Sequence, residues 1–177
     1  VITNSGEDVT NNYSFTFATG TLSISCNNSA TAPTITNSAY TGSEITGVSG
    51  GTNIDLSGVT TAVEVGDYKA YATPKANYCW SDYSTAKKEY NWSIGSSKPT
   101  ATIADKTVTY TGSEVTSNTA TVTTPDGGTI PSSSVTYSYY SGASCSGTAL
   151  SSKPVNAGSY SVKAKVAAYG NYSATES

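Results

Sequence analysis

A five-residue motif occurs twice without change and constrains the fold more than any other feature. Tyr40-Thr-Gly-Ser-Glu44 recurs as Tyr110-Thr-Gly-Ser-Glu114, 70 positions further along the 177-residue chain. Repetition on this scale is typical of tandem domains, and the spacing suits a small β-sandwich. The sequence therefore predicts two related domains, preceded by a shorter fragment.

Two further signals follow each copy of the motif in the same order. A Gly-x-Tyr signal and then an Asn-Tyr pair stand at Gly66-Asp-Tyr68 and Asn77-Tyr78, and again at Gly158-Ser-Tyr160 and Asn171-Tyr172. A third pair, Asn12-Tyr13, stands near the start. The Gly-x-Tyr hydroxyl is expected to bond nearby backbone, as in the tyrosine corner of Greek-key sandwiches. The Asn-Tyr pair suits a tight turn, because Asn tolerates the left-handed conformation.

Residue usage indicates strands and turns. The aromatic residues are 14 Tyr, 2 Phe and 2 Trp, and His and Met do not occur. β-branched and aromatic residues favour pleated, half-buried strands, and the runs of Ala, Leu, Glu and Lys that favour helices are missing. The predicted fold class is all-β, with tandem Ig-like Greek-key β-sandwich modules that form a fragment of a longer repeat array.

The motifs divide the chain into three expected parts. Residues 1–26 are interpreted as the C-terminal hairpin of a preceding Ig-like module, residues 27–95 as a short module, and residues 96–177 as a longer module that lacks its last strand. This is the pattern expected of a window cut from a longer array. Apolar residues alternate with Ser and Thr in residues 14–24, which predicts a hairpin with one buried face. These apolar residues are Phe15, Phe17, Leu22 and Ile24.

Four aromatic residues are predicted to form the structural core. They are Tyr68, Trp80, Trp92 and Tyr160. The two tryptophans bury large areas if they face inward, and the two tyrosines belong to the Gly-x-Tyr signals. The alternating pattern also predicts strands at residues 107–110, 135–140 and 159–166.

The three cysteines are Cys26, Cys79 and Cys145. They are too few for a disulfide scaffold, and we expect ordinary small residues, one of them packed beside Trp80. One structural bridge that leaves one thiol over is the alternative, and the sequence does not decide which pair would form it.

Charge and motif content exclude several function classes. The net charge is −3, and the absence of arginine removes the bidentate fork that reads phosphates and bases, so no nucleic-acid partner is expected. No apolar stretch is long enough to span a membrane. The chain has no histidine for general base catalysis, no Gly-x-Ser-x-Gly elbow and no phosphate-binding loop. We expect no enzyme activity, no catalytic residue and no cofactor.

Two sharper site hypotheses compete with the interpretation of these residues as solvated surface charge. Asp55, Glu64, Asp67 and Asp82 are carboxylates of the kind that binds Ca²⁺, but none lies in a recognisable Ca²⁺ loop, and no metal site is predicted. Lys69 and Asn91 are conceivable partners for an isopeptide cross-link, although no spacing rule supports the pairing.

The order Tyr-x-Gly, Gly-x-Tyr, Asn-Tyr and closing hairpin is similar to that of bacterial Ig-like repeat domains. Asn12-Tyr-Ser-Phe-Thr-Phe-Ala-Thr-Gly-Thr-Leu-Ser-Ile24 resembles the C-terminal hairpin of the MBG repeat, and residues 66–82 resemble a related repeat of surface-anchored proteins. Such repeats occur in large surface proteins of Gram-positive bacteria and in phage virion proteins. The resemblance implies an extracellular, cell-surface or virion-surface module without catalytic residues.

Two functions from different classes follow. The first is a structural spacer of a surface stalk, filament or virion appendage, whose partners are neighbouring Ig-like modules or copies of itself. The second is an adhesin that binds glycan or a host protein through residues 125–153, with Tyr139 and Tyr140 pointing outward. A further hypothesis is that a hairpin of one chain completes the open module of the next by strand addition.

Overall fold

The structure is a computed structural model that describes residues 3–8 and 18–177. This part of the chain is all-β, with several small sheets and one 3₁₀ turn, η2 (Ser132–Ser134). The strands are β1 (Thr3–Asn4), β2 (Glu7–Asp8), β3 (Thr34–Ile35), β4 (Ser38–Ala39), β5 (Ile45–Thr46), β6 (Val48–Ser49), β7 (Ile54–Gly58), β8 (Thr61–Ala62), β9 (Gly66–Pro74), β10 (Lys88–Gly95), β11 (Thr100–Thr102), β12 (Thr121–Thr123), β13 (Val135–Ser141), β14 (Tyr160–Val166) and β15 (Thr175–Glu176).

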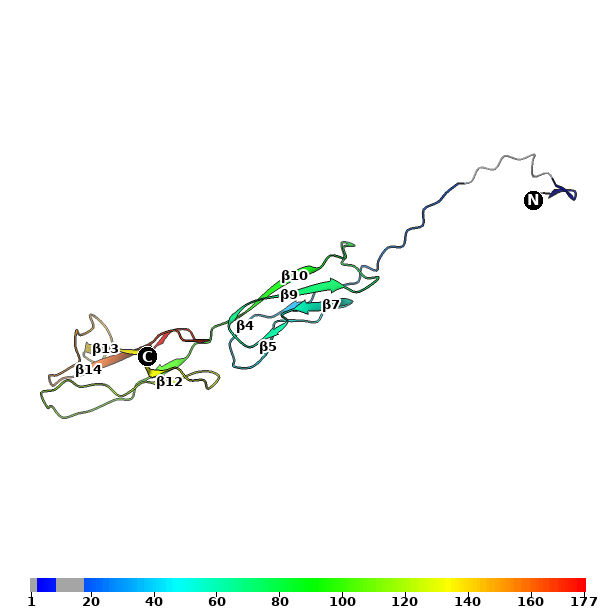
Figure 1. Ribbon diagram of the computed structural model, residues 1–177. Helices are drawn as coiled ribbons and strands as arrows, with labels where there is room; N and C mark the ends of the chain where they lie inside the picture. The colour runs from blue at the N-terminus through cyan, green and yellow to red at the C-terminus, as the bar shows by residue number, and fades with distance from the viewer. Residues whose placement is uncertain (1–2, 9–17) are drawn as a thin grey trace.

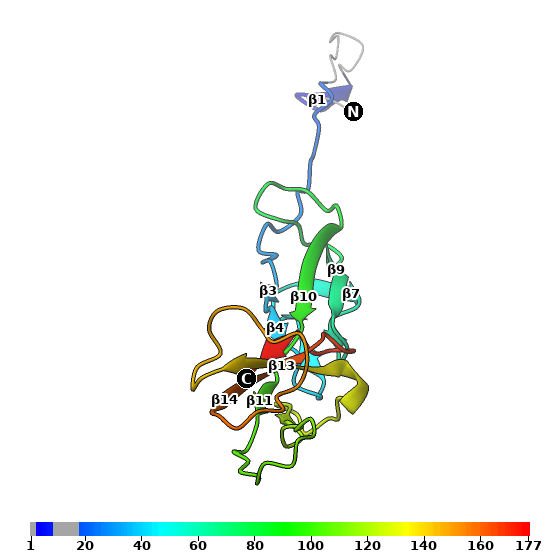
Figure 2. The same cartoon turned by 90° about the vertical axis from the view of Figure 1, so that its left-hand side faces the viewer.

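The molecule is elongated, with two β regions arranged end to end (Figure 1). We call residues 27–95 the first segment and residues 96–177 the second segment. Residues 18–26 form an extended arm that leaves the first segment at the end remote from the second (Figures 1 and 2).

The first segment is built on a four-stranded sheet in the order β4-β10-β9-β7. β9 and β10 are antiparallel, with Tyr68 opposite Trp92, and β4 pairs parallel with Ile94 and Gly95 at the end of β10. The short pairs β3-β6 and β5-β8 complete the segment. Val48 of β6 packs against Trp92 and Ile94 of the sheet, so a second β layer covers one face, as in a β-sandwich.

Trp92 lies at the centre of the first segment. It is 2% exposed, and its indole N–H donates to the Val59 carbonyl at 2.7 Å. The Tyr68 ring stacks on it with centroids 4.7 Å apart. A Cβ at Gly47 would overlap the Trp92 ring. The close approach of the β5–β6 connection to Trp92 of β10 therefore depends on glycine at this position.

Trp80 belongs to a separate core cluster of the same segment. It is 3% exposed and packs with Ala30, Ile54 and Ala72. Its indole N–H donates to the Ala86 carbonyl at 2.8 Å, which satisfies the only polar atom of a buried ring.

The second segment contains the pair β11-β12 and the sheet β13-β14-β15. Its Gly-x-Tyr tyrosine behaves as in the first segment. The Tyr160 hydroxyl donates to the Asn156 carbonyl at 3.0 Å, and the Tyr68 hydroxyl donates to the Glu64 carbonyl at 2.6 Å. Both rings are half-buried, and both bond the residue four positions earlier, as expected for a tyrosine corner.

Two predicted strands differ from the structure. Residues 107–110 lie in the long connection between β11 and β12 and form no strand. The corresponding strand of the first segment, β4, pairs with the end of β10. No described strand of the second segment takes the place of β10, so residues 107–110 have no such partner. Leu22 and Ile24 are 88% and 90% exposed rather than buried, since the arm contacts no second apolar layer in the part of the chain that is described. Phe15 and Phe17 lie outside the described residues.

Candidate functional site

The second Asn-Tyr pair holds the entry of the second segment. The Ser97 N–H donates to the Asn171 carbonyl at 3.0 Å, and the Ser173 N–H donates to the Ser97 carbonyl at 2.9 Å. These bonds form a parallel bridge between Ser97 and Tyr172. The bridge fixes the chain just after β10, so the path between the segments is defined by backbone bonds.

The Asn171 side chain reaches across to the first segment. Its amide nitrogen donates to the Glu64 carboxylate at 2.7 Å, and its amide oxygen accepts the Val65 N–H at 3.3 Å. A bond to a charged acceptor is stronger than one between neutral groups. One side chain thus binds both a carboxylate and the backbone of the neighbouring segment.

Tyr172 fills the centre of this junction. Its ring is 8% exposed and packs edge-on against Tyr40, with centroids 5.9 Å apart and an interplanar angle of 81°. Edge-to-face packing is a favourable arrangement for two aromatic rings. Tyr40 belongs to the first copy of the five-residue motif, so the contact joins that motif to the second Asn-Tyr pair.

The Tyr172 hydroxyl also lies 2.8 Å from both carboxylate oxygens of Asp126. This hydrogen bond lowers the pKa of Asp126, with the Gly128 N–H assisting. The same bond raises the pKa of Tyr172, because the phenolate would face a carboxylate. Both shifts favour the protonated phenol and the ionised carboxylate at neutral pH.

Two glycines leave the space that these groups occupy. A Cβ at Gly128 would overlap the Tyr172 hydroxyl, and a Cβ at Gly42 would lie 2.9 Å from the Asp126 Cβ. Gly42 also has a φ of +78°, which L side chains rarely adopt. The turn of the five-residue motif therefore lies directly against the second segment.

The first Asn-Tyr pair holds the arm with the same backbone bonds. The Asn27 N–H donates to the Asn77 carbonyl at 2.8 Å, and the Cys79 N–H donates to the Asn27 carbonyl at 2.8 Å. A parallel bridge again results, here between Asn27 and Tyr78. Asn77 has a φ of +68°, as the turn interpretation of the pair predicts. Asn27 and Ser97 are therefore equivalent.

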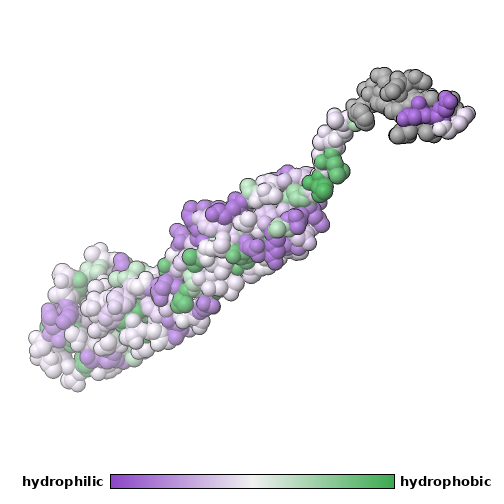
Figure 3. Space-filling view, turned by 45° about the vertical axis from the view of Figure 1, so that its right-hand side comes forward, coloured by the Kyte–Doolittle hydropathy of each residue, from purple (hydrophilic) through white to green (hydrophobic). Residues whose placement is uncertain are grey.

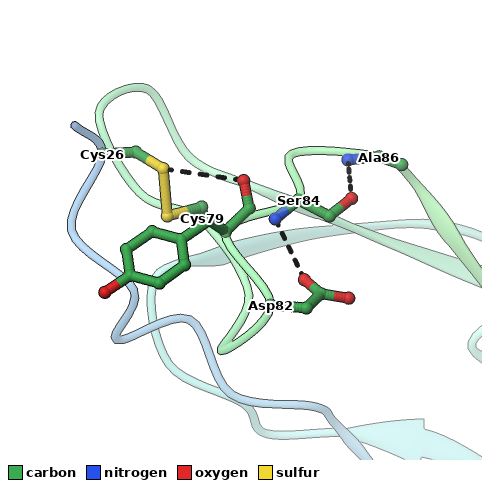
Figure 4. The surroundings of a disulfide bond; sticks show 6 residues. Cys26, Cys79, Asp82, Ser84 and Ala86 are labelled. Atoms are coloured by element: carbon green, nitrogen blue, oxygen red, sulfur yellow. Dashed lines mark hydrogen bonds between the residues drawn. A yellow bond between two sulfur atoms is a disulfide. The ribbon is translucent and has the colours of Figure 1, made fainter. Parts of the chain in front are cut away.

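A disulfide closes this first junction. Cys26 and Cys79 are joined, with Cα atoms 5.8 Å apart (Figure 4). The expectation of three unpaired cysteines was wrong, because the sequence did not show that the arm returns to the Asn-Tyr turn. Cys79 is fully buried, and Cys145 is the free thiol.

The loop beyond the disulfide is held by short side-chain bonds (Figure 4). The Ser84 N–H donates to Asp82 at 2.9 Å, and the Ala86 N–H donates to the Ser84 hydroxyl at 3.1 Å. The Ser84 bond lowers the pKa of Asp82, and Lys88 contributes to the shift. The loop thus positions the Ala86 carbonyl to accept the Trp80 indole N–H.

The candidate Ca²⁺-binding carboxylates do not converge on one site. The Asp55 carboxylate lies 3.9 Å from the Lys75 ammonium. The Asp82 carboxylate accepts the Ser84 N–H within its own loop, and the Glu64 carboxylate accepts the Asn171 side-chain amide. Within the described residues, no group of three potential metal ligands is found.

Lys69 and Asn91 do lie opposite each other in the β9-β10 ladder. The Lys69 ammonium, however, is 2.8 Å from Glu89 on an exposed face. The hydrogen bond that the Lys69 ammonium donates to the Glu89 carboxylate raises the pKa of Lys69. Isopeptide formation requires an uncharged amine, whereas Lys69 is held as an ammonium by this ion pair, so the cross-link stays a hypothesis.

The adhesin hypothesis requires exposed rings at Tyr139 and Tyr140. Tyr139 is only 8% exposed, and its hydroxyl accepts the Ser117 N–H at 3.2 Å. Tyr137, on the same strand face, accepts the Ala120 N–H at 2.8 Å. Tyr140 is half-buried. The hydroxyls of Tyr137 and Tyr139 thus bond the backbone of the connection that leads to β12. These two rings support the fold and are not presented to solvent as a binding surface.

Sequence reasoning missed the junction residues Glu64, Asp126 and the side chain of Asn171. The repeated motifs contained a signal for part of the site, because Tyr40 and Tyr172 both belong to them. Asp126 lies in a turn that only the second segment has, so no repeat pointed to it.

Within the described residues, no helix has the length and apolar content needed to cross a bilayer. Comparison with known protein families, with curated proteins and with solved structures gave no match.

Proposed function

We propose that this chain is a non-enzymatic structural spacer, made of tandem Ig-like modules that stack into a stiff rod. The observation that carries the proposal is the junction at Asn171 and Tyr172. There, backbone, amide, carboxylate and aromatic contacts all connect the two segments. Flexible linkers are rich in Gly and Ser and behave as coils. Here the Ser-containing linker is instead held by bonds to its neighbours.

Further support comes from a backbone bridge that is repeated at the start of both segments. Both Asn-Tyr pairs bond the incoming chain in the same way, as expected if each module fixes the orientation of the module before it. In an array of this kind, stability and shape depend on contacts between neighbours. The Cys26–Cys79 disulfide suits an oxidising, extracellular setting. This agrees with the cell-surface or virion location implied by the resemblance to bacterial Ig-like repeats.

Rigidity is the property to test, by residual dipolar couplings of the weakly aligned protein. A rigid rod gives both segments one alignment tensor. Asn171→Asp places a carboxylate against Glu64 and removes the amide donor, so the two tensors should separate. Asn77→Asp is the matched control, because the Asn77 side chain is exposed and takes part in no hydrogen bond among the described residues. Independent tensors in the unmodified protein would refute the spacer proposal.

A further inference from the structure

The outer face of the four-stranded sheet carries a groove that the proposed function does not use. Ala70 of β9 and both Trp92 and Ile94 of β10 are buried in the core. The residues that alternate with them along the two strands therefore lie on the opposite face of the sheet. That face holds a shallow groove of about 330 Å³, which lies at the lower end of the range usual for small-molecule sites.

Polar side chains form the walls of this groove. They are Asn37, Asp67, Lys69, Asn91 and Ser93. In the β9-β10 ladder, Asp67 lies opposite Ser93, and Lys69 lies opposite Asn91. Tyr68 and Trp92 also line the groove, but their rings pack in the core. The floor is therefore the backbone of these two residues.

Two of the wall residues are held in place from within the same face. The Lys69 ammonium donates to the Glu89 carboxylate at 2.8 Å. This hydrogen bond lowers the pKa of Glu89, and the Asn91 and Tyr71 side chains contribute to the shift. Glu89 is thus ionised at neutral pH and orients both Lys69 and Asn91. A site whose side chains are already oriented loses less conformational entropy when a ligand binds.

The other wall residues have hydrogen-bonding capacity to spare. The Asn37 side-chain oxygen accepts the Ser93 N–H at 2.8 Å, so the orientation of this amide is fixed. Its N–H groups have no acceptor among the described residues. The Asp67 carboxylate is exposed and makes no hydrogen bond or ion pair within the described chain. The groove therefore presents amide donors beside a carboxylate that only accepts.

The shared plan of the two segments does not require these side chains. Tyr68 and Tyr160 are the two corner tyrosines, so Asp67 corresponds to Ser159. Counted from the repeated five-residue motif, Asn37 corresponds to Thr107. The second segment thus keeps neither the carboxylate nor the amide, as expected if these groups serve a ligand rather than the fold.

The chemistry of the groove selects the class of ligand. An anion would face the unpaired Asp67 carboxylate, and no group of three potential metal ligands is found in the described part of the chain. An apolar ligand would meet no apolar wall, and the surface of the first segment in Figure 3 is mostly hydrophilic, with small hydrophobic patches. Sugar hydroxyls, in contrast, donate to carboxylates and accept from amides and ammonium groups.

We propose that this groove on the outer face of the first segment binds a neutral saccharide. Asp67 accepts hydrogen bonds from sugar hydroxyls, and Asn37 and Lys69 donate to hydroxyl oxygens. The inference goes beyond the proposed function, because a stiff spacer needs no ligand site. It also differs from the adhesin hypothesis in its location, since that hypothesis uses residues 125–153 of the second segment.

The test is NMR titration of the nitrogen-15-labelled full chain with three soluble probes: cellotriose, maltotriose and triacetylchitotriose. At least one probe should produce saturable shifts in the backbone amides of residues 67–69 and 91–93 and in the Asn37 side-chain amide. Asp67→Ala should weaken this binding about tenfold, the loss expected for one hydrogen bond to a charged group. Asp55→Ala is the matched control, because Asp55 is an exposed carboxylate of the same sheet that does not line the groove.

Saturable binding that Asp67→Ala weakens and Asp55→Ala leaves unchanged would support the inference. Absence of saturable shifts with all three probes would overturn it, as would shifts that are unchanged in Asp67→Ala or that lie outside the groove. The same spectra show that each variant is folded, since amides remote from the groove should keep their resonances. Dipolar couplings measured without sugar test the spacer separately, so either proposal can fail while the other stands.

Discussion

The two junctions share a backbone design but are closed by different chemistry. Asn27 and Ser97 are each held between the carbonyl and the N–H of an Asn-Tyr turn. At the first junction a disulfide joins the flanking positions Cys26 and Cys79. At the second, the equivalent positions are Ser96 and Ser173, and the Ser173 hydroxyl donates to the Ser97 carbonyl at 3.3 Å.

This difference shows that the backbone bridge is the common element and the closure is variable. A disulfide acts mainly by restricting the unfolded chain, so it requires no neighbouring segment. The closure at the second junction uses Glu64 and Tyr40 from the first segment and Asp126 from the second. It therefore also positions one segment against the other.

Removing the disulfide should have the largest effect. Cys26→Ser with Cys79→Ser removes a cross-link between residues 53 positions apart. The unfolding free energy of the first segment should fall by about 4 kcal/mol, because the unfolded chain is no longer restricted by this loop. Both tryptophans lie in that segment, so fluorescence during urea unfolding reports on it alone. Cys145→Ser should leave the midpoint unchanged. An unchanged midpoint in the double variant would show that the bridge does not stabilise the fold.

Transferring the disulfide to the second junction should have the next largest effect. Ser96→Cys with Ser173→Cys places thiols at the equivalent positions, and a bridge there should stabilise the second segment by about 2–4 kcal/mol. Amide hydrogen exchange of β14 under oxidising and reducing conditions measures the gain. Failure of the bridge to form would show that the two junctions are not geometrically equivalent.

A smaller effect is expected from the Tyr172 hydroxyl. Tyr172→Phe removes the bond to Asp126 but keeps the packing on Tyr40, and the melting temperature of the second segment should fall by about 5 °C. Tyr78→Phe is the matched control, because the Tyr78 hydroxyl makes no hydrogen bond within the described chain. Calorimetry compares the two variants, and equal shifts would contradict the assigned role of Asp126.

The smallest effect is a pH dependence confined to the second junction. The lowered pKa of Asp126 means that its contribution is present above about pH 4 and is lost as pH falls through the folded-state value. The raised pKa of Tyr172 means that its contribution is present below about pH 10 and is lost at higher pH. Thermal unfolding followed by NMR should show both losses, and Asp126→Asn should abolish them.

The local patterns predicted the strands better than the contacts between them. Alternation correctly indicated β14 near residues 159–166 and β13 near residues 135–140, because a strand with one buried face leaves a period of two. Residues 107–110 have the same alternation and form no strand. A strand needs a partner, and that partner is set by topology rather than by local sequence.

The candidate site was predictable only where the repeat marked it. Tyr40 and Tyr172 were visible as motif residues, but their contact joins positions far apart in sequence. The Cys26–Cys79 bridge depends on the arm returning to the Asn-Tyr turn, which no spacing rule for three cysteines describes. Glu64 and Asp126 were ordinary turn carboxylates until the fold placed Asn171 and Tyr172 beside them.

The position of the Cys26–Cys79 bond has a mechanical consequence. Tension that enters through the arm reaches Cys26 and passes covalently to Cys79, so residues 27–78 carry no load. Fully extended, these residues would span about 180 Å, and the disulfide keeps this length from being pulled out. The second segment has no such bypass and would extend fully once its junction opened. Under force the first segment would act as a tether of nearly fixed length, and the second as the part that yields.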